Sequence, residues 1–158
     1  MILSLEEPII FDFQIISPHV LRKSMIESNF TDGLPNHPAM RAALDAYVER
    51  INAGDVEGIL ALFAPDAVIE DPVGSEAKTG AAIRGWFADT VAFESRIHPL
   101  GPARGSHGRE AALAFDVEFT PPGSTRLRIR SIDVCSFDSQ NRITHLRGYW
   151  GPDDIGPA

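Results

Sequence analysis

The first half of the chain carries hydrophobic residues at the spacing of α-helices. From Pro38 the apolar positions fall on one helical stripe, made of Met40, Ala43, Leu44, Tyr47, Val48 and Ile51. Gly54 is expected to end this helix and Asp55 to cap a second one. The second stripe is short, closes at Pro65 and contains Val56, Ile59, Leu60 and Phe63. A third, with Thr79 as its expected cap, contains Ile83, Trp86, Phe87 and Thr90. The pattern therefore predicts three helices.

The second half alternates apolar and polar residues, as β-strands do. Residues 111–119, 126–137 and 143–150 are the expected strands, separated by turns at 121–124 and 138–141. Residues 98–106 read as a further strand or loop, and an earlier strand ends in a loop at Asp71-Pro72. Helices followed by an antiparallel meander predict an α+β fold. A curved sheet wrapped around the helices would form a cone with an apolar interior.

Residues 1–36 differ in character from the rest of the chain. An apolar run, Ile9 to Ile16, is broken by Asp12 and Gln14, and acidic residues precede it where a secretory signal would be basic. Turn-forming residues dominate 28–38. We expect an irregular leader or arm, part of it a mis-assigned translation start. Alternatively, the run at 9–16 forms a strand or helix that covers the domain. The main domain is predicted at 37–152, with a C-terminal tail at 153–158.

The composition is that of a globular chain long enough for one domain, with 44% hydrophobic and 23% charged residues. A net charge of -8 argues against nucleic acid or an anionic membrane as a partner. Cys135 is the single cysteine, which rules out an intrachain disulfide and a cysteine-cluster metal site. The histidines have no ligand spacing, so no metal is expected. No apolar run is long enough to span a bilayer, and a cytoplasmic location is the default expectation.

Asp71 is the first candidate for chemistry. It shares a strand face with Ala67 and Ile69, and Pro72 biases it toward an extended conformation. The sequence thus directs one carboxylate from a strand end toward an apolar face. A lone aspartate of this kind is weak evidence, and it needs partners elsewhere in the chain.

Asp133 and Tyr47 are the candidate partners. Asp133 shares its strand face with Ile129, Cys135 and Phe137, and no basic residue lies on that face nearby. A carboxylate in such surroundings must find a cation or stay protonated, and a protonated aspartate donates a hydrogen bond. The alternative is a buried aspartate bonded to backbone amides. Tyr47 lies in the buried helical stripe, either as a core aromatic or with its hydroxyl directed into a pocket.

Several segments resemble bacterial steroid Δ5-isomerases, the ketosteroid isomerases. The resemblance covers roughly residues 40 to 150 and is carried by 46–49 (AYVE), 52–55 (NAGD), 61–67 (ALFAPDA), 70–76 (EDPVGSE), 131–134 (SIDV), 142–143 (RI) and 148–150 (GYW). The three functional positions match in type and order as Tyr47, Asp71 and Asp133. Their superfamily has the cone-shaped nuclear-transport-factor-2-like fold, which hosts several activities, so the fold alone does not give the function.

The resemblance implies that the protein moves the double bond of a 3-oxo-Δ5-steroid into conjugation, without cofactor or metal. Asp71 would be the general base and proton shuttle, while Tyr47 and protonated Asp133 would donate hydrogen bonds to the oxygen of a dienolate. The expected apolar substrate wall includes Phe63, Trp86, Phe87, Phe115 and Trp150. A homodimer is implied as well.

One position departs from the family pattern. Phe87 stands where related proteins commonly have a tyrosine that supports the oxyanion-hole tyrosine, and the chain has only Tyr47 and Tyr149. Two other functions stay open: a SnoaL-like polyketide cyclase that uses Asp71 on a different enolisable substrate, and a non-catalytic binder of steroids or lipids. An epoxide hydrolase would need an arginine between two pocket carboxylates, whereas the arginines of 126–130 are expected on the outward face.

Overall fold

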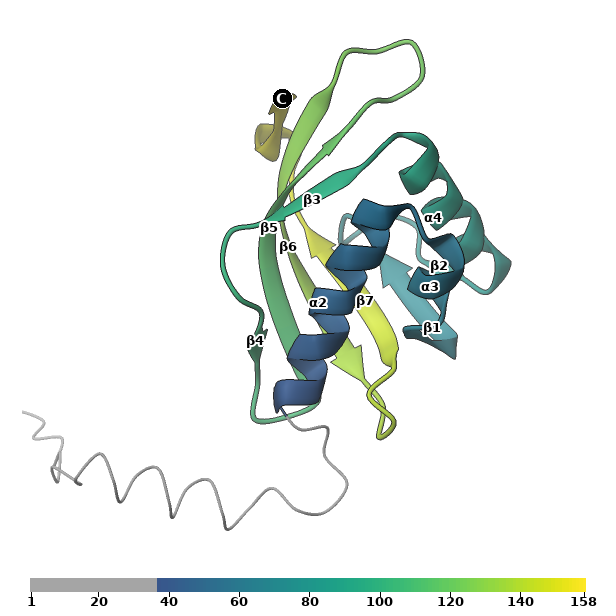
Figure 1. Cartoon of the computed structure of the whole chain (residues 1–158), viewed down its shortest axis with the longest axis vertical. Helices are drawn as coiled ribbons and strands as arrows, with labels where there is room; N and C mark the ends of the chain where they lie inside the picture. The colour runs from purple at the N-terminus through teal and green to yellow at the C-terminus, as the bar shows by residue number, and fades with distance from the viewer. Residues whose placement is uncertain (1–36) are drawn as a thin grey trace, which may run out of the picture. The chain divides into compact units, whose positions relative to one another are not determined.

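The computed structural model describes residues 37–158, so the expectations for the leader at 1–36 lie outside the described residues. Three helices, α2 (His37–Ala53), α3 (Val56–Leu60) and α4 (Ala81–Ala92), pack on one face of a curved mixed sheet (Figure 1). The α+β prediction is confirmed.

The sheet has eight strands, of which six form the order β2-β1-β7-β6-β5-β3. Their bounds are β1 (Phe63–Glu70), β2 (Lys78–Thr79), β3 (Arg96–Pro99), β5 (Glu110–Phe119), β6 (Leu127–Phe137) and β7 (Ile143–Tyr149). Two short strands lie off this path, since β4 (Arg104–Gly105) pairs with β5 and β8 (Ile155–Pro157) pairs with β6. The pairing of β1 with β7 is parallel, whereas the other pairings are antiparallel. The alternation read from the sequence thus located β5, β6 and β7 closely.

The first helix forms as the hydrophobic stripe predicts. Met40, Leu44, Tyr47 and Ile51 are buried on one side of α2. Gly54 ends the helix with φ of 70°, and the Asp55 carboxylate accepts a hydrogen bond from the Gly58 amide at 2.8 Å, so the predicted cap of α3 is present. At the sheet, the Asn52 side chain both donates to and accepts from the backbone of Ile97. This pair fixes the end of α2 against β3.

Two boundaries differ from the prediction. The second helix ends at Leu60, and Phe63 begins β1 with Pro65 inside that strand. Phe63 fits the helical pattern and the strand pattern equally well, because an apolar residue at this position is buried in either conformation. Thr79 does not cap α4, because it lies in β2 and pairs with Val68 of β1. Gly80, with φ of 52°, occupies the N-cap position of α4 and forms no side-chain hydrogen bond there. Thr79 therefore extends the sheet instead of opening the helix.

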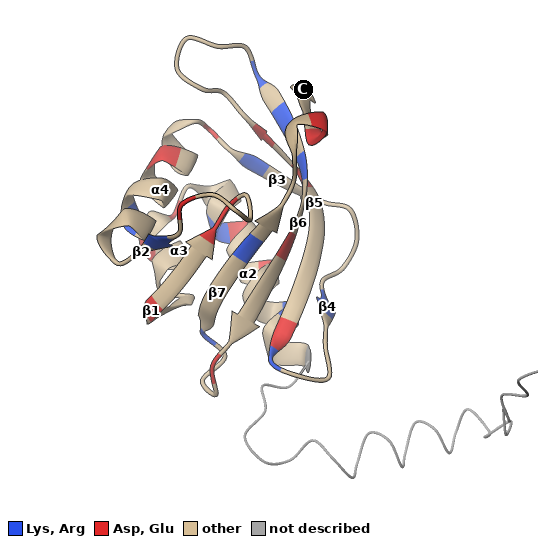
Figure 2. Cartoon of the chain, turned by 180° about the vertical axis from the view of Figure 1, so that it is seen from behind, with Lys and Arg blue, Asp and Glu red and all other residues tan. Residues whose placement is uncertain are grey.

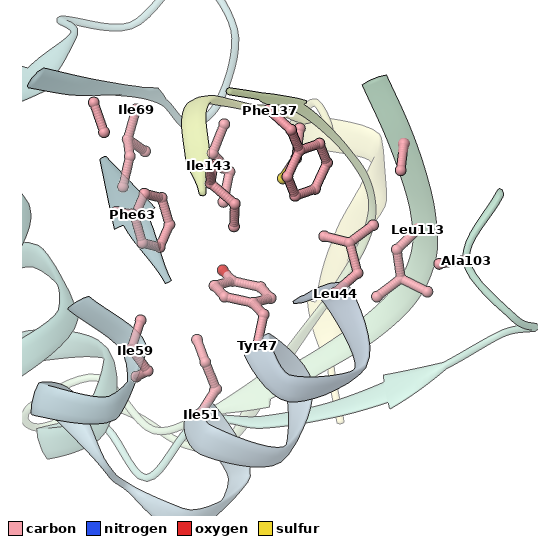
Figure 3. Packing of buried hydrophobic residues seen from close by; sticks show 14 of the residues in the cluster. Leu44, Tyr47, Ile51, Ile59, Phe63, Ile69, Ala103, Leu113, Phe137 and Ile143 are labelled. Atoms are coloured by element: carbon pink, nitrogen blue, oxygen red, sulfur yellow. The ribbon is translucent and has the colours of Figure 1, made fainter. Parts of the chain in front are cut away.

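The hydrophobic core lies between the helices and the concave face of the sheet. Figure 3 shows Tyr47 and Ile51 of α2 among side chains of α3, β1 and the later strands. The C-terminal residues are part of this fold. Within the predicted tail at 153–158, β8 pairs with the start of β6, so that Ile155 lies opposite Ile129.

Candidate active site

A cavity of about 340 Å³ opens between α2, α4 and the concave face of the sheet. Its wall is mainly apolar and is contributed by α2, α4, β3, β5 and β6, together with Trp150 and Ile155 near the C-terminus. Tyr47, Asp71 and Asp133 all line it, so the fold brings the three sequence-predicted positions into one space. An apolar cavity with a few converging polar groups is the usual form of a small-molecule site.

Asp71 follows directly after β1 and is partly buried. Its carboxylate accepts a hydrogen bond from the Trp150 indole nitrogen at 2.6 Å. Burial raises the pKa of Asp71, while the Trp150 hydrogen bond and the positive charge of Lys78 act in the opposite direction. Asp71 therefore has two partners that favour its ionised form.

Gly148 explains why Asp71 can lie where it does. A β-carbon on Gly148 would fall 2.5 Å from Oδ1 of Asp71, which leaves no room for a side chain. Gly148 of β7 is the direct antiparallel partner of Asp133 on β6. The carboxylate of Asp71 thus fills the space above Gly148, next to Asp133 across the pair of strands.

Asp133 is buried with 3% exposure, and its carboxylate accepts a hydrogen bond from the Ser131 hydroxyl at 3.3 Å. Within residues 37–158 it has no cationic partner and no backbone amide donor. Burial raises the pKa of Asp133 well above its ordinary value, the charge of Asp71 adds to the rise, and the Ser131 bond opposes it. Burial and the charge of an ionised Asp71 therefore both favour the protonated form of Asp133.

Tyr47 is buried with 3% exposure, and its hydroxyl forms no hydrogen bond with another residue in the described part of the chain. Its ring packs edge-on against Phe63 and Phe87, with centroid distances of 6.5 and 6.2 Å. Burial first, and then the charges of Asp133 and Asp71, raise the pKa of Tyr47. Tyr47 is thus a neutral phenol whose ring is held by aromatic packing against Phe63 and Phe87.

The apolar residues predicted as a substrate wall divide into two groups. Trp86, Phe115 and Trp150 line the cavity. The structure places Phe63 and Phe87 outside its lining, in the core behind Tyr47, with their ring centroids 5.4 Å apart. The reason is that β1 and α4 turn these two rings toward the ring of Tyr47.

Sequence reasoning missed three contributions to the site. Trp150 was expected only as wall, yet it also donates to Asp71. Its period-two spacing from Gly148, on the face opposite Tyr149, was the available signal. Ser131 shares the strand face of Asp133, so the sequence could predict that the two side chains lie close together. It could not predict the hydrogen bond between them. The requirement for glycine at 148 had no local signal, because it depends on the loop after β1.

No group of three potential metal-binding side chains occurs within the described residues. None of the arginines of residues 37–158 lines the cavity. Arg126 and Arg130 instead form ion pairs with Glu118 and Asp116 at partly exposed positions. These arginines therefore lie outside the cavity, as the alternation of the strand predicts.

Comparison with known proteins agrees with this architecture. Residues 44–146 match the SnoaL-like domain. The chain belongs to the SnoaL-like family. This family lies within the nuclear-transport-factor-2-like superfamily that the sequence segments indicated. The helix α2, the strands β1 to β7 and both carboxylates fall within or beside the matched range.

Three relatives of this SnoaL-like protein illustrate the range of the family. A steroid Δ-isomerase of Nocardioides simplex is 34% identical over 73% of this chain and 93% of its own length. The epoxide hydrolase LasB of Streptomyces lasalocidi is 34% identical over 68% of this chain but 40% of its own length. The solved structure of SalBIII, described as an epoxide hydrolase/cyclase-like enzyme in pyran ring formation in polyether salinomycin, is 34% identical. It matches with a TM-score of 0.72 over 77% of this chain and 97% of its own. All three are named as enzymes.

Proposed function

We propose that this protein is a steroid Δ-isomerase, which moves the double bond of a 3-oxo-Δ5-steroid to the conjugated 3-oxo-Δ4 position. The observation that carries the proposal is the difference in surroundings between two neighbouring carboxyl groups that line one cavity. Asp71 accepts a hydrogen bond from Trp150 and feels the positive charge of Lys78, and both favour its ionised form. Asp133 is buried, and its burial and the charge of Asp71 both raise its pKa. A base and a neutral donor in one apolar cavity suit proton transfer next to a carbonyl.

In the proposed reaction, the Asp71 carboxylate removes a proton from the carbon between the carbonyl and the double bond. The electrons of the broken C–H bond move toward the carbonyl and give a dienolate. The Tyr47 hydroxyl and protonated Asp133 donate hydrogen bonds to its oxygen, and each such donor is worth on the order of 3 kcal/mol in the transition state. The Asp71 carboxyl then returns the proton two carbons further along, so the proton and the charge both balance without a cofactor.

The relatives support a second candidate, the opening of an epoxide by a hydroxyl group or by water. LasB and SalBIII carry names of that kind. Here protonated Asp133 would give its proton to the epoxide oxygen, and Asp71 would take the proton of the attacking hydroxyl. We favour the isomerase because the unpartnered Tyr47 hydroxyl beside Asp133 makes a two-donor site, which a developing enolate oxygen needs and a single acid step does not.

The discriminating experiment is to mix the protein with a 3-oxo-Δ5-steroid and to follow the ultraviolet absorbance of the conjugated enone. A parallel sample receives a hydroxy-epoxide, analysed for ring-opened products. The isomerase proposal predicts a rise in absorbance with the steroid. Epoxide consumption without such a rise would favour the second candidate, and binding of steroid without any chemistry would favour a carrier protein.

A further inference from the structure

Ser131 lies in the cavity beside Asp133, and the proposed reaction gives it no part. It is two residues before Asp133 on β6, so both side chains point to the concave face of the sheet. Both are buried, with 2% and 3% exposure, and both line the cavity. Ile129, the next residue on this face, also lines the cavity, whereas Cys135 beyond Asp133 does not. Ser131 therefore lies on the side of Asp133 that faces the body of the cavity.

A hydrogen bond joins the two side chains. The Ser131 hydroxyl donates to Oδ1 of Asp133 at 3.3 Å. This distance is long for two oxygen atoms, and hydrogen bonds in active sites commonly shorten once a ligand is bound. A hydroxyl has one proton to donate, so this contact commits the Ser131 proton to Asp133. The oxygen of a ligand is thus left to Tyr47 and Asp133 as donors.

A protonated carboxyl group has two unlike oxygens, and the Ser131 hydrogen bond distinguishes them. One oxygen carries the proton and donates, while the other is a carbonyl oxygen and accepts. Because Oδ1 of Asp133 accepts from Ser131, the proton is favoured on Oδ2. Without this donor, either oxygen can carry the proton, and the terminal torsion of the aspartate has a broad energy profile. Part of the population would then present an acceptor to a ligand oxygen where a donor is needed.

The backbone holds Ser131 firmly in this position. Ser131 lies inside β6, opposite Phe115 of β5, in a pairing that runs without a break from Glu110 to Phe119. Asp133 belongs to the same pairing, so one rigid strand fixes the spacing of the two side chains. A serine has a single torsion between its backbone and its oxygen, so little freedom remains for the donor. Donors that are fixed before the ligand arrives are the effective ones in catalysis.

We propose that Ser131 is a positioning residue of the oxyanion site, which holds Oδ1 of Asp133 so that the proton on Oδ2 is directed to the ligand oxygen. This inference rests on the proposed function and deepens it, because it names what orients one of the two oxyanion donors. Ser131 acts through Asp133, so its effect should vanish when the carboxyl group of Asp133 is removed.

The test compares Ser131→Thr with Ser131→Val, two strand-forming side chains that differ by a hydroxyl against a methyl group. One measurement is the rate of enone formation from a 3-oxo-Δ5-steroid. We expect kcat of Ser131→Val to be fivefold to tenfold below that of Ser131→Thr, with KM within twofold, because oxyanion donors act mainly in the transition state. Ser131→Thr should stay within threefold of wild type, since it keeps the hydroxyl.

The second measurement is equilibrium binding of 2-naphthol by calorimetry, which needs no reaction. Its oxygen, like that of a dienolate, is attached to a flat ring system and accepts hydrogen bonds. Ser131→Val should bind 2-naphthol threefold to tenfold more weakly than Ser131→Thr. Ser136→Thr and Ser136→Val are the matched control pair, on the same strand but outside the cavity, and they should not differ in either measurement.

The same Ser131 pair in an Asp133→Leu background shows whether Ser131 acts through Asp133. With the carboxyl group gone, the Thr and Val variants should agree within twofold in rate and in affinity for 2-naphthol. A difference that persists in this background would overturn the proposal, because Ser131 would then act on the ligand directly. Equal rates and affinities for the pair with Asp133 present would overturn it as well.

The two measurements separate this inference from the proposed function. A difference in 2-naphthol affinity that depends on Asp133, without any isomerisation by wild type, would support the positioning role and reject the isomerase. Isomerisation by wild type with equal values for the Ser131→Thr and Ser131→Val variants would do the reverse. Failure of wild type both to bind 2-naphthol and to isomerise the steroid would reject both.

Discussion

The proposed hydrogen-bond donors of Asp133 and Tyr47 can each be removed by one substitution that leaves the neighbouring residues unchanged. Tyr47→Phe keeps the ring that packs on Phe63 and Phe87, and Asp133→Leu replaces a buried carboxyl by an apolar group. Each should lower the isomerisation rate by about a hundredfold to a thousandfold, because each removes one oxyanion donor. Steady-state kinetics with the enone assay measure the rate, and circular dichroism checks the fold. Rates within threefold of wild type for both variants would contradict the two-donor site.

The stability of the protein should report the protonation of Asp133 directly. Its pKa is raised above 3.8 in the folded chain, so the folded protein retains a proton that the unfolded chain releases first. Its contribution is therefore fully present at acid pH and declines as pH rises above 3.8, by at most about 1.4 kcal/mol per pH unit.

Asp133→Leu removes this decline. The free energy of unfolding of the variant, measured with urea, should increase relative to wild type as the pH rises from about 4 toward neutrality. Asp71, whose pKa is also raised, is present in both proteins and contributes similarly to each. A difference between the two proteins that stays constant with pH would mean that Asp133 is ionised in the fold.

At the scale of elements, the site depends on how closely the loop after β1 approaches β7. Gly148→Ala should lower activity at least tenfold with the fold retained, because the added carbon would displace the Asp71 carboxylate from its Trp150 hydrogen bond. Gly85→Ala is the matched control. Nothing lies within 4 Å of its added carbon on α4, and alanine there should raise stability by up to about 1 kcal/mol with unchanged activity. Kinetics and thermal melts of both variants measure these effects, and full activity in Gly148→Ala would contradict the described packing.

The elements also show what the sequence could and could not predict. Helix α2 and the strands β5, β6 and β7 were predictable because their periodicity is strong and one face is buried. Phe63 and Thr79 were assigned to the wrong elements, since tertiary pairing with β7 and β1 determines their conformation. The close pairing of Asp71 with Gly148 was not predictable, because it joins residues far apart in the chain. Residue type identified the catalytic candidates, while the support from Trp150 and Ser131 required the structure.

At the scale of the described domain, the outward face of the sheet carries an apolar row. Leu100, Ile132 and Tyr149 are 54%, 49% and 45% exposed. Leu100 bonds to Ala114, which lies opposite Ile132, and Ile132 lies opposite Tyr149. Figure 2 views the sheet from this side, with basic and acidic segments distributed along its strands. An exposed apolar patch with a polar rim is typical of a protein–protein interface.

We therefore predict a homodimer that packs through this row. Ile132→Glu should shift the protein to monomers in light scattering, because it places a charge at the centre of the contact. Ala82→Glu adds the same charge at an exposed position of α4 and should leave the dimer intact. A wild-type monomer at tens of micromolar protein would contradict the prediction.

No helix among residues 37–158 is long and apolar enough to cross a membrane.

The central claim is that Asp71 carries the proton from one carbon of the substrate to another. The most direct measurement is the initial rate of enone formation from a 3-oxo-Δ5-steroid by wild type and by Asp71→Asn at equal concentration. The amide keeps the size of the side chain and can still lie beside Trp150, but it cannot accept the proton. We expect a rise in absorbance with wild type and a loss of at least a thousandfold in the variant, with steroid binding retained. Equal rates for the two proteins would contradict the account.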